Sequence, residues 1–121
     1  MLQPVTAEAI AKLIYGNRFR FVDERTLQNE IEDLFKEHAI PYIREKVLTP
    51  KDRIDFLCGS VGVEIKIGGG LNSVQRQLWR YAADERITDL ILVTSRSGHK
   101  SLPDKITGKP IYVVHLINSI F

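Results

Sequence analysis

The segment RIDFLCGSVGVEIKI, residues 53–67, constrains the fold of this chain more than any other part of the sequence. It consists of two short, mainly apolar runs separated by Gly59-Ser60. A glycine accepts the positive φ that a two-residue hairpin loop requires. The pattern therefore predicts two antiparallel strands, over residues 53–58 and 61–67, joined by a tight turn.

The turn sets the register of this hairpin. If Cys58 pairs with Val61, then Asp55 lies opposite Glu64 with the side chains ~4.5–5.5 Å apart, where like charges are destabilising. Lys66 offsets part of the repulsion, because the two-residue repeat of a strand places it on the same face as Glu64. A divalent cation would offset more, since hard ions such as Mg²⁺ bind carboxylate oxygens and keep waters for chemistry.

These three residues could carry phosphate chemistry. A metal ion held by Asp55 and Glu64 could polarise a phosphoryl oxygen and lower the pKa of a bound water. Lys66 could orient that water or neutralise charge that develops on the phosphate. The alternative is an exposed hairpin face with ordinary surface ion pairs, which is frequent in antiparallel sheets.

Length and composition predict one soluble domain. The chain has 121 residues, of which 44% are hydrophobic and 26% are charged, and a domain of this size buries enough surface to fold without crosslinks. No apolar run approaches the ~20 residues of a membrane span. We expect a cytoplasmic protein, because the N-terminus lacks the pattern of a secretion signal and a lone cysteine, Cys58, fits a reducing compartment. Cys58 itself is expected to be a buried hydrophobe.

The net charge of +2 is small, but it is unevenly distributed along the chain. Residues 38–121 contain twelve Lys or Arg against eight Asp or Glu. This excess of positive charge is compatible with a nucleic-acid partner and does not require one.

Helix and strand signals surround the hairpin. Apolar periodicity and capping residues predict three helices, at residues 6–15, 25–38 and about 73–85, the last one capped by Asn72 or Ser73. Further strands are predicted at residues 41–48, 89–95 and 111–117, with a polar loop over 96–110. A strand, a crossover helix and another strand form a right-handed parallel βαβ unit. We therefore predict an α/β fold in which helices flank both faces of a mixed, twisted β-sheet.

Glu30 is the candidate acid on the second predicted helix. It follows Leu27 by three residues and precedes Leu34 by four, which places it beside the apolar stripe of that helix. From there it could reach past the edge of the core toward a metal ion bound at the sheet. Glu37, one heptad further along, is its main competitor, and a solvated acidic helix face is the alternative interpretation.

The third predicted helix and the glycine-rich segment before it add polar candidates. Gln77 and Tyr81 share one side of the helix, where Gln77 could hydrogen-bond a site carboxylate, a water or a phosphate, unless it is a buried residue with a local partner. Arg76 and Arg80 form a second pair suited to phosphate contacts, although solvated helix arginines are equally frequent. The glycines at 68–70 either admit a phosphate close to the backbone or provide a flexible exit from the strand.

Basic residues also follow the predicted buried strand. Arg96, His99 and Lys100 lie on the loop where an α/β sheet usually presents its ligands, which makes them candidates for contacts with a nucleic-acid backbone. The three histidines have no zinc-like spacing. No Walker motif and no GxGxxG is present, so we expect no small-molecule cofactor.

The assembled pattern resembles the PD-(D/E)XK nuclease superfamily, which includes restriction endonucleases, archaeal-type Holliday junction resolvases and RecB-like nucleases. The resemblance covers about residues 25–95. Its carboxylate and lysine positions match Asp55, Glu64 and Lys66, and the helix-borne acid matches Glu30. The segment from Gln77 to Tyr81 looks like the Gln-x-x-x-Tyr motif of RecB-like members. Ile54 stands where the family name has a proline, at a position that varies widely within the family.

The resemblance implies a fold and an organisation. The fold is a restriction-endonuclease-like mixed sheet with the core order αβββαβ. The chain is then a single nuclease domain over residues 1–121, with an N-terminal helix in 1–22 and a final strand in 109–121.

The resemblance also implies an activity, which is hydrolysis of DNA phosphodiester bonds by an activated water with Mg²⁺ or Mn²⁺. The implied metal ligands are Asp55, Glu64 and Glu30, and Lys66 and Gln77 complete the catalytic set. The expected DNA contacts are Arg76, Arg80, Tyr81, Arg96 and Lys100.

The small size, with no appended specificity domain, suits a structure-specific endonuclease of phage or mobile-element type in a prokaryotic or phage-infected cell. The resemblance implies a homodimer, because members of the family often pair so that two strands can be cut. The alternative from another class is a catalytically inactive nuclease-fold module that binds DNA or a protein. RNA processing is a third possibility, since no residue pattern here distinguishes a 2′-hydroxyl.

Overall fold

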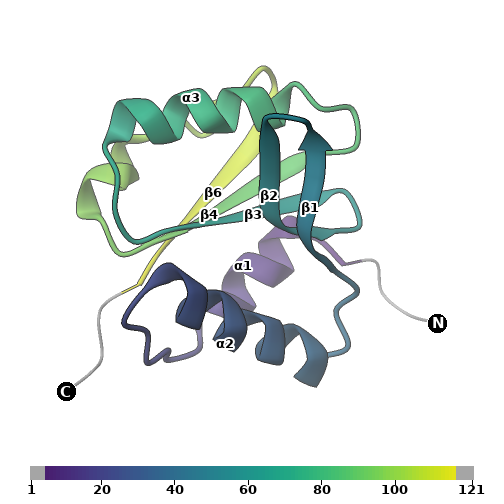
Figure 1. Ribbon diagram of the computed structural model, residues 1–121, viewed down its shortest axis with the longest axis vertical. Coiled ribbons are helices and arrows are strands. Elements are labelled where there is room, and N and C mark those ends of the chain that lie inside the picture. Colours follow the sequence, from purple (N-terminus) through teal and green to yellow (C-terminus); the bar gives the residue numbers. More distant parts are fainter. Residues whose placement is uncertain (1–4, 117–121) are drawn as a thin grey trace.

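The computed structural model describes residues 5–116, which form a mixed six-stranded β-sheet with α-helices on both faces (Figure 1). The α-helices of this part of the chain are α1 (Ala7–Tyr15), α2 (Glu24–Glu37) and α3 (Leu71–Ala82), and η1 (Ser97–Ser101) is a short 3-10 helix. The strands are β1 (Ile43–Thr49), β2 (Asp52–Cys58), β3 (Val61–Lys66), β4 (Asp89–Thr94), β5 (Lys105–Ile106) and β6 (Lys109–His115). The predicted α/β class is confirmed.

The sheet combines an antiparallel half with a parallel half. Its strand order is β1-β2-β3-β4-β6-β5. The strands β1, β2 and β3 pair antiparallel, β3, β4 and β6 pair parallel, and the two-residue β5 pairs antiparallel with β6. The crossover from β3 through α3 to β4 gives the parallel unit that the sequence predicts. The hairpin of β2 and β3 therefore leads directly into the buried centre of the sheet.

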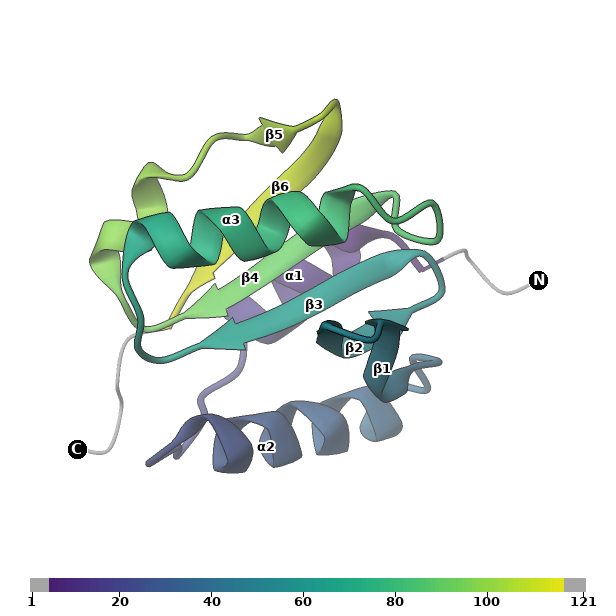
Figure 2. The same cartoon turned by 45° about the horizontal axis from the view of Figure 1, so that its top comes forward.

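Each face of the sheet has its own apolar core. One core joins α1 and α2 to the sheet through residues such as Ile10, Leu27 and Phe35. The other joins α3 to the opposite face through residues such as Leu78 and Tyr81. Figure 2 shows α3 on one side of β3 and β4 and α1 on the other. Both faces of β4 are thus covered, which explains its continuous apolar run.

Three parts of the fold differ from the sequence-based expectation: α3, the segment after β4, and the last strand, β6, which runs over Lys109–His115 where residues 111–117 were expected, with residue 117 outside the described residues. The helix α3 begins at Leu71 with Gly70 as its N-cap, so neither Asn72 nor Ser73 caps it, and it ends at Ala82. Glycine is tolerated at the N-cap but has no side chain that could cap the helix, so a search for capping side chains misses this start. The segment expected to be a loop contains η1 and β5. The strand β5 forms because Thr107 and Gly108 adopt positive φ and turn the chain into a hairpin with β6.

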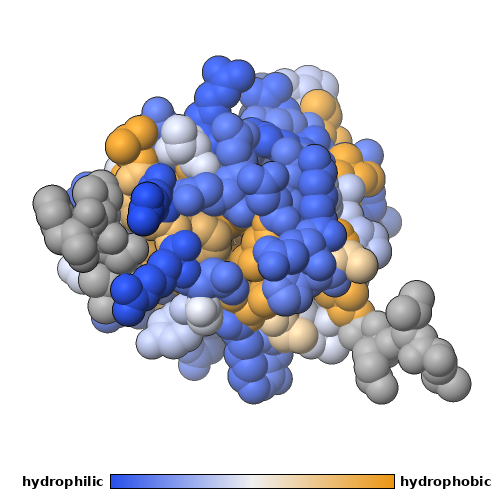
Figure 3. Space-filling model, turned by 90° about the horizontal axis from the view of Figure 1, so that it is seen from below, coloured by the Kyte–Doolittle hydropathy of each residue, from blue (hydrophilic) through white to orange (hydrophobic). Residues whose placement is uncertain are grey.

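The surface on the α2 side is mainly hydrophilic, with smaller apolar groups between the polar side chains (Figure 3). This agrees with an amphipathic α2 whose buried residues include Leu27, Ile31 and Phe35. Among residues 5–116, no helix combines the length and the apolar character needed to cross a membrane.

Gly62 on β3 provides a test of the packing between β2, β4 and α3. A Cβ atom at this position would lie 2.6 Å from Ile54 Cδ1 and 2.9 Å from Leu90 Cδ2, both in the core under α3. We expect Gly62→Ala to lower the free energy of unfolding by about 1–3 kcal/mol, because a filled core resists extra volume. Chemical denaturation measures this change. The matched variant Gly98→Ala, where a Cβ meets nothing within 4 Å, should stay within about 0.5 kcal/mol of the parent.

Candidate active site

The site is built where β2 and β3 stop pairing. Their ladder holds Cys58 against Val61, Leu57 against Gly62 and Phe56 against Val63, which confirms the predicted register as far as Phe56. The ladder does not extend to Asp55. Ile54 packs in the α3 core whereas Phe56 packs in the opposite core. In a regular strand, residues two apart point to the same face of the sheet. Ile54 and Phe56 pack on opposite faces, so the strand β2 is irregular at Asp55.

Two carboxylates replace the missing backbone bonds. The Asp55 amide donates a hydrogen bond to Glu64 Oε1 (3.2 Å), and the Ile65 amide donates one to Asp55 Oδ2 (2.8 Å). Each acid thus binds a backbone amide of the opposite strand, which was not foreseen from the regular pairing assumed for the sequence. The exchange keeps both carboxylates at the point where the two strands separate.

Burial makes ionisation of this pair costly. Glu64 is 3% exposed and Asp55 is half-buried. Burial raises the pKa of the Glu64 carboxyl, the charge of Asp55 raises it further, and Lys66 opposes the rise. Burial also raises the pKa of Asp55, where the hydrogen bond from Ile65 opposes the change. The site therefore lacks enough positive charge of its own to balance both acids in their ionised forms.

Lys66 supplies part of that charge. Its Nζ lies 3.1 Å from Glu64 Oε2, so the two side chains share a face of β3 as the two-residue repeat predicts. The lysine side chain is 22% exposed, against 4% for the glutamate. Lys66 thus connects the buried carboxylates to the solvent-facing side of the site.

Glu24, the first residue of α2, reaches the same region and was missed by the sequence analysis. Its Oε1 accepts a hydrogen bond from the Ile67 amide (3.1 Å), directly after β3. A capping box formed by Asp23 and Thr26 holds the start of the helix in place. A signal was present in the sequence, because an acid next to an N-cap residue sits at the very end of its helix, where it can extend beyond the core.

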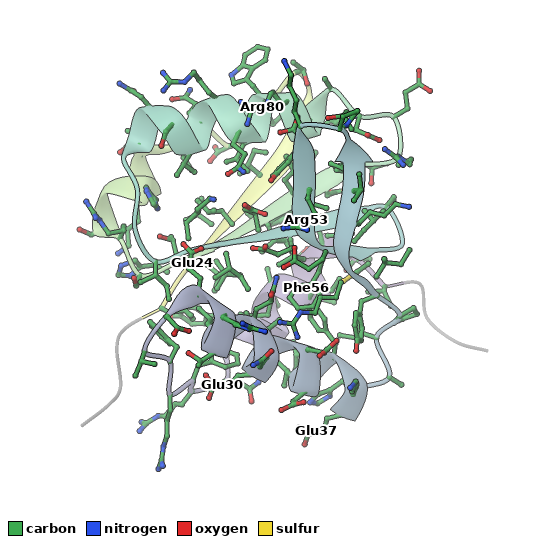
Figure 4. The ribbon with its side chains drawn as sticks, in the orientation of Figure 1. Glu24, Glu30, Glu37, Arg53, Phe56 and Arg80 are labelled. Atoms are coloured by element: carbon green, nitrogen blue, oxygen red, sulfur yellow. The ribbon has the colours of Figure 1, made fainter. Side chains whose placement is uncertain are left out.

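Glu30 is not brought to the Asp55–Glu64 pair. Its Oε1 accepts a hydrogen bond from the Arg20 amide (2.8 Å) in the connection between α1 and α2. Figure 4 shows Glu24 on the side of α2 that faces the strands and Glu30 and Glu37 on the opposite side. The helical wheel placed Glu30 correctly at the edge of the apolar stripe, but on the edge that faces α1 and its connection.

Two clefts open beside the carboxylates, and Glu24 lines both. One, of about 510 Å³, is lined by residues that include Lys66, Gln77 and Arg80, together with the backbone of Gly68 and Gly69. The other, also about 510 Å³, is lined by Asp55 together with Arg25, Gln28, Arg44 and Glu45. The structure therefore brings Gln77 and Lys66 to one cleft, with Asp55 at the neighbouring one.

Tyr81 and Arg80 hold α3 against the β1–β2 hairpin. Tyr81 is 0% exposed and its hydroxyl donates to the Arg53 carbonyl (3.0 Å), which excludes the direct DNA contact expected for it. Arg80 is exposed, and its Nε donates to both carboxylate oxygens of the buried Asp52, at 2.9 and 3.2 Å. In Figure 4, Arg80 lies on α3 and Arg53 on the hairpin. Both contacts fix the helix that carries Gln77.

The remaining predicted contacts lie in different places. Arg76, Arg96 and Lys100 are exposed, and Lys100 lines a separate hollow with Tyr15 and His115. His99 is buried, with Nδ1 2.6 Å from Thr94 Oγ1 and Nε2 3.2 Å from the Gly69 carbonyl, so it braces the glycine segment.

The cysteine has a structural position. Cys58 is 2% exposed, and burial raises the pKa of its thiol to about 12. This confirms the prediction of a buried hydrophobe, because a thiol so disfavoured as a thiolate is a poor nucleophile.

Comparison with known proteins adds no relative. No family model matches the chain, and neither the curated proteins nor the solved structures that were searched contain a match. Within residues 5–116, no three His, Cys, Asp or Glu side chains form a group that could hold a metal ion by themselves. The chemistry of the site therefore depends on the half-buried Asp55, the buried Glu64 and the groups around them.

The raised pKa values predict an unusual dependence of stability on pH. A carboxyl with a higher pKa in the native state binds more protons than in the unfolded chain, so stability is lost as the pH rises between the two values. Without divalent cations, the contribution of Asp55 and Glu64 to the free energy of unfolding should therefore fall as the pH rises above about 4. Denaturation across pH 4 to 8 measures this slope.

Glu64→Gln should flatten the same profile, because the amide keeps an acceptor for the Asp55 amide and carries no charge. We expect the variant to gain on the order of 1 kcal/mol over the parent at pH 8 and to converge with it at low pH. Parallel profiles for the two proteins would contradict the assignment of a raised pKa to Glu64.

Proposed function

We propose that the protein is a metal-dependent nuclease of the restriction-endonuclease-like class that hydrolyses DNA phosphodiester bonds. The observation that carries the proposal is the pair of carboxylates formed by the half-buried Asp55 and the buried Glu64, with Lys66 Nζ 3.1 Å from Glu64 Oε2. The order α2-β1-β2-β3-α3-β4 supports it, because it agrees with the αβββαβ order implied by the resemblance.

The donor set fits a small hard cation. Carboxylate oxygens are the ligands that Mg²⁺ prefers, and Mg²⁺ commonly uses one or two carboxylates together with waters and substrate phosphates. A third acidic ligand is therefore not required, and Glu24 lines both clefts beside the pair. When bound, the ion would polarise a phosphoryl oxygen and lower the pKa of a water.

The protein's own side chains would position the substrate. The ammonium group of Lys66 lies on the solvent-facing side of Glu64. A phosphate that enters the cleft would replace Glu64 as the ion-pair partner of this ammonium group. Gln77 lines the same cleft and offers an amide donor and an acceptor. Because Glu64 is little exposed, water screens the electrostatic interactions at this site less, and they are stronger than at the surface.

A DNA-binding module without nuclease activity is the second candidate function, and the contacts of the charged groups favour it. The ion pair of Lys66 with Glu64 and the two hydrogen bonds between carboxylates and amides already give each charged group a partner inside the protein. A module of the same fold that binds DNA without cleaving it would retain this arrangement. It would show salt-dependent binding and no turnover.

Cleavage assays with Mg²⁺ on duplex, single-stranded, flapped and four-way-junction DNA test the two functions. We expect cleavage of at least one substrate, and a loss of about 100-fold or more in Lys66→Ala and in Asp55→Ala. Lys105→Ala, which removes an exposed lysine on β5, is the control and should retain activity. DNA binding with no cleavage on any substrate would favour the second function, and equal cleavage by all variants would refute the proposed site.

The choice between the two helix-borne acids has its own test. Glu24→Gln and Glu30→Gln both preserve an oxygen that can accept the backbone hydrogen bond seen at that residue. We expect Glu24→Gln to lower kcat by about tenfold or more, because it removes negative charge beside the cation site, and Glu30→Gln to leave kcat unchanged. The reverse result would restore Glu30 as the helix acid.

A further inference from the structure

The outer surface of α3 carries an exposed aromatic side chain that the proposed chemistry does not use. Trp79, the one tryptophan of the chain, is 51% exposed. Arg76 precedes it by three residues and therefore neighbours it on the helix surface, and Arg80 follows it directly in the sequence. A shallow groove of about 450 Å³ runs here, lined by Asn72, Gln75, Arg76, Trp79 and Arg80.

The charge of this groove suits a polyanion. Its lining contains two arginines, two side-chain amides and no acid. Both hydrogen bonds from Arg80 to Asp52 come from Nε, so that ion pair does not use the two terminal nitrogens of the guanidinium. Those nitrogens have the geometry that binds phosphate oxygens.

The groove lies beside the candidate active site, with which it shares one lining residue. Arg80 lines both the groove and the cleft that contains Lys66 and Gln77. A polynucleotide strand that leaves the cleft along α3 would therefore meet Arg80 first and Trp79 next.

We propose that this groove binds unpaired nucleotides of single-stranded DNA beside the cleavage point. A base stacks on the indole of Trp79, and the flanking phosphates contact Arg76 and Arg80. The proposal rests on the proposed function and narrows its substrate to DNA with a single-stranded segment. Sequence-independent single-strand sites have this composition, a positively charged groove with an aromatic surface for stacking.

Single-stranded DNA fits this surface better than other occupants. The bases of a duplex are already stacked on one another, so their faces are not offered to an exposed indole. Tryptophan and arginine also anchor protein interfaces, but the lining around Trp79 offers two arginines and two amides and no acid, which is the charge that suits a nucleic-acid backbone.

Tryptophan fluorescence tests the proposal directly, because Trp79 is the only emitter of its type. The protein is titrated with an oligothymidine and with a duplex of equal length in the presence of a chelator, so that no cleavage occurs. We expect the single strand to quench the emission and the duplex to leave it nearly unchanged. Quenching of equal size by both, or by neither, would overturn the proposal.

Variants link the signal to affinity, measured by the anisotropy of a labelled oligothymidine. Trp79→Ala should weaken binding by about tenfold or more, and Trp79→Phe should recover most of it. Tyr15→Ala removes an aromatic side chain that is 72% exposed on α1, and it should change nothing. Arg76→Ala should reduce the slope of log affinity against log salt by about 0.7. Unaltered binding by Trp79→Ala would refute the stacking site.

The remaining outcomes separate this proposal from its alternatives. Quenching by oligouridine but not by oligothymidine, or an emission that changes with protein concentration without any nucleic acid, would overturn it in favour of RNA or of a second copy of the chain. Cleavage that is independent of Trp79 would leave the proposed function intact while this inference fails. Quenching and tight binding without any cleavage would support the single-strand groove and refute the nuclease activity.

Discussion

Two hydrogen bonds between side chain and backbone, from the Asp55 amide to Glu64 and from the Ile65 amide to Asp55, organise the centre of this protein. They take the place of ladder bonds between β2 and β3. The strands can separate at this point without leaving these two amides unpaired, which would otherwise be costly in a buried position. The separation lets Ile54 and Phe56 enter different cores. It also leaves Asp55 at one cleft and Lys66, the ion-pair partner of Glu64, at the other.

In this arrangement, the burial that would favour cation binding also lowers the stability of the folded protein. Burial strengthens any interaction between the carboxylates and a cation, and it also makes their ionised forms costly when no cation is present. Lys66 compensates only in part, because one ammonium faces two acids. Such conflict between local rules and global stability is characteristic of functional sites.

The rest of the fold holds α3 and the glycine segment around the carboxylates. Tyr81 and Arg80 attach α3 to the β1–β2 hairpin, and His99 attaches the glycine segment to the end of β4. The buried side of α3 therefore supports the site through Tyr81, and the exposed side of the same helix presents Trp79, Arg76 and Arg80. A change in the position of α3 would alter the cleft and the groove together, since Arg80 lines both.

Local patterns in the sequence determined most elements of this fold: the hairpin with its turn at Gly59, the amphipathic α2, the buried β4 and the placement of Glu64 and Lys66 on one face. These follow from periodicities of two and 3.6 residues, which the chain carries regardless of its neighbours. The tertiary structure alone decided where β2 turns over, and therefore that Asp55 binds a backbone amide instead of facing Glu64 in a regular pair. It also decided which of Glu24 and Glu30 lies near the sheet, because a helical wheel shows that a residue lies at the edge of an apolar stripe but not which neighbour that edge meets. The capping box at Asp23 and the contact with Ile67 direct Glu24 to the sheet, while the α1–α2 connection takes Glu30.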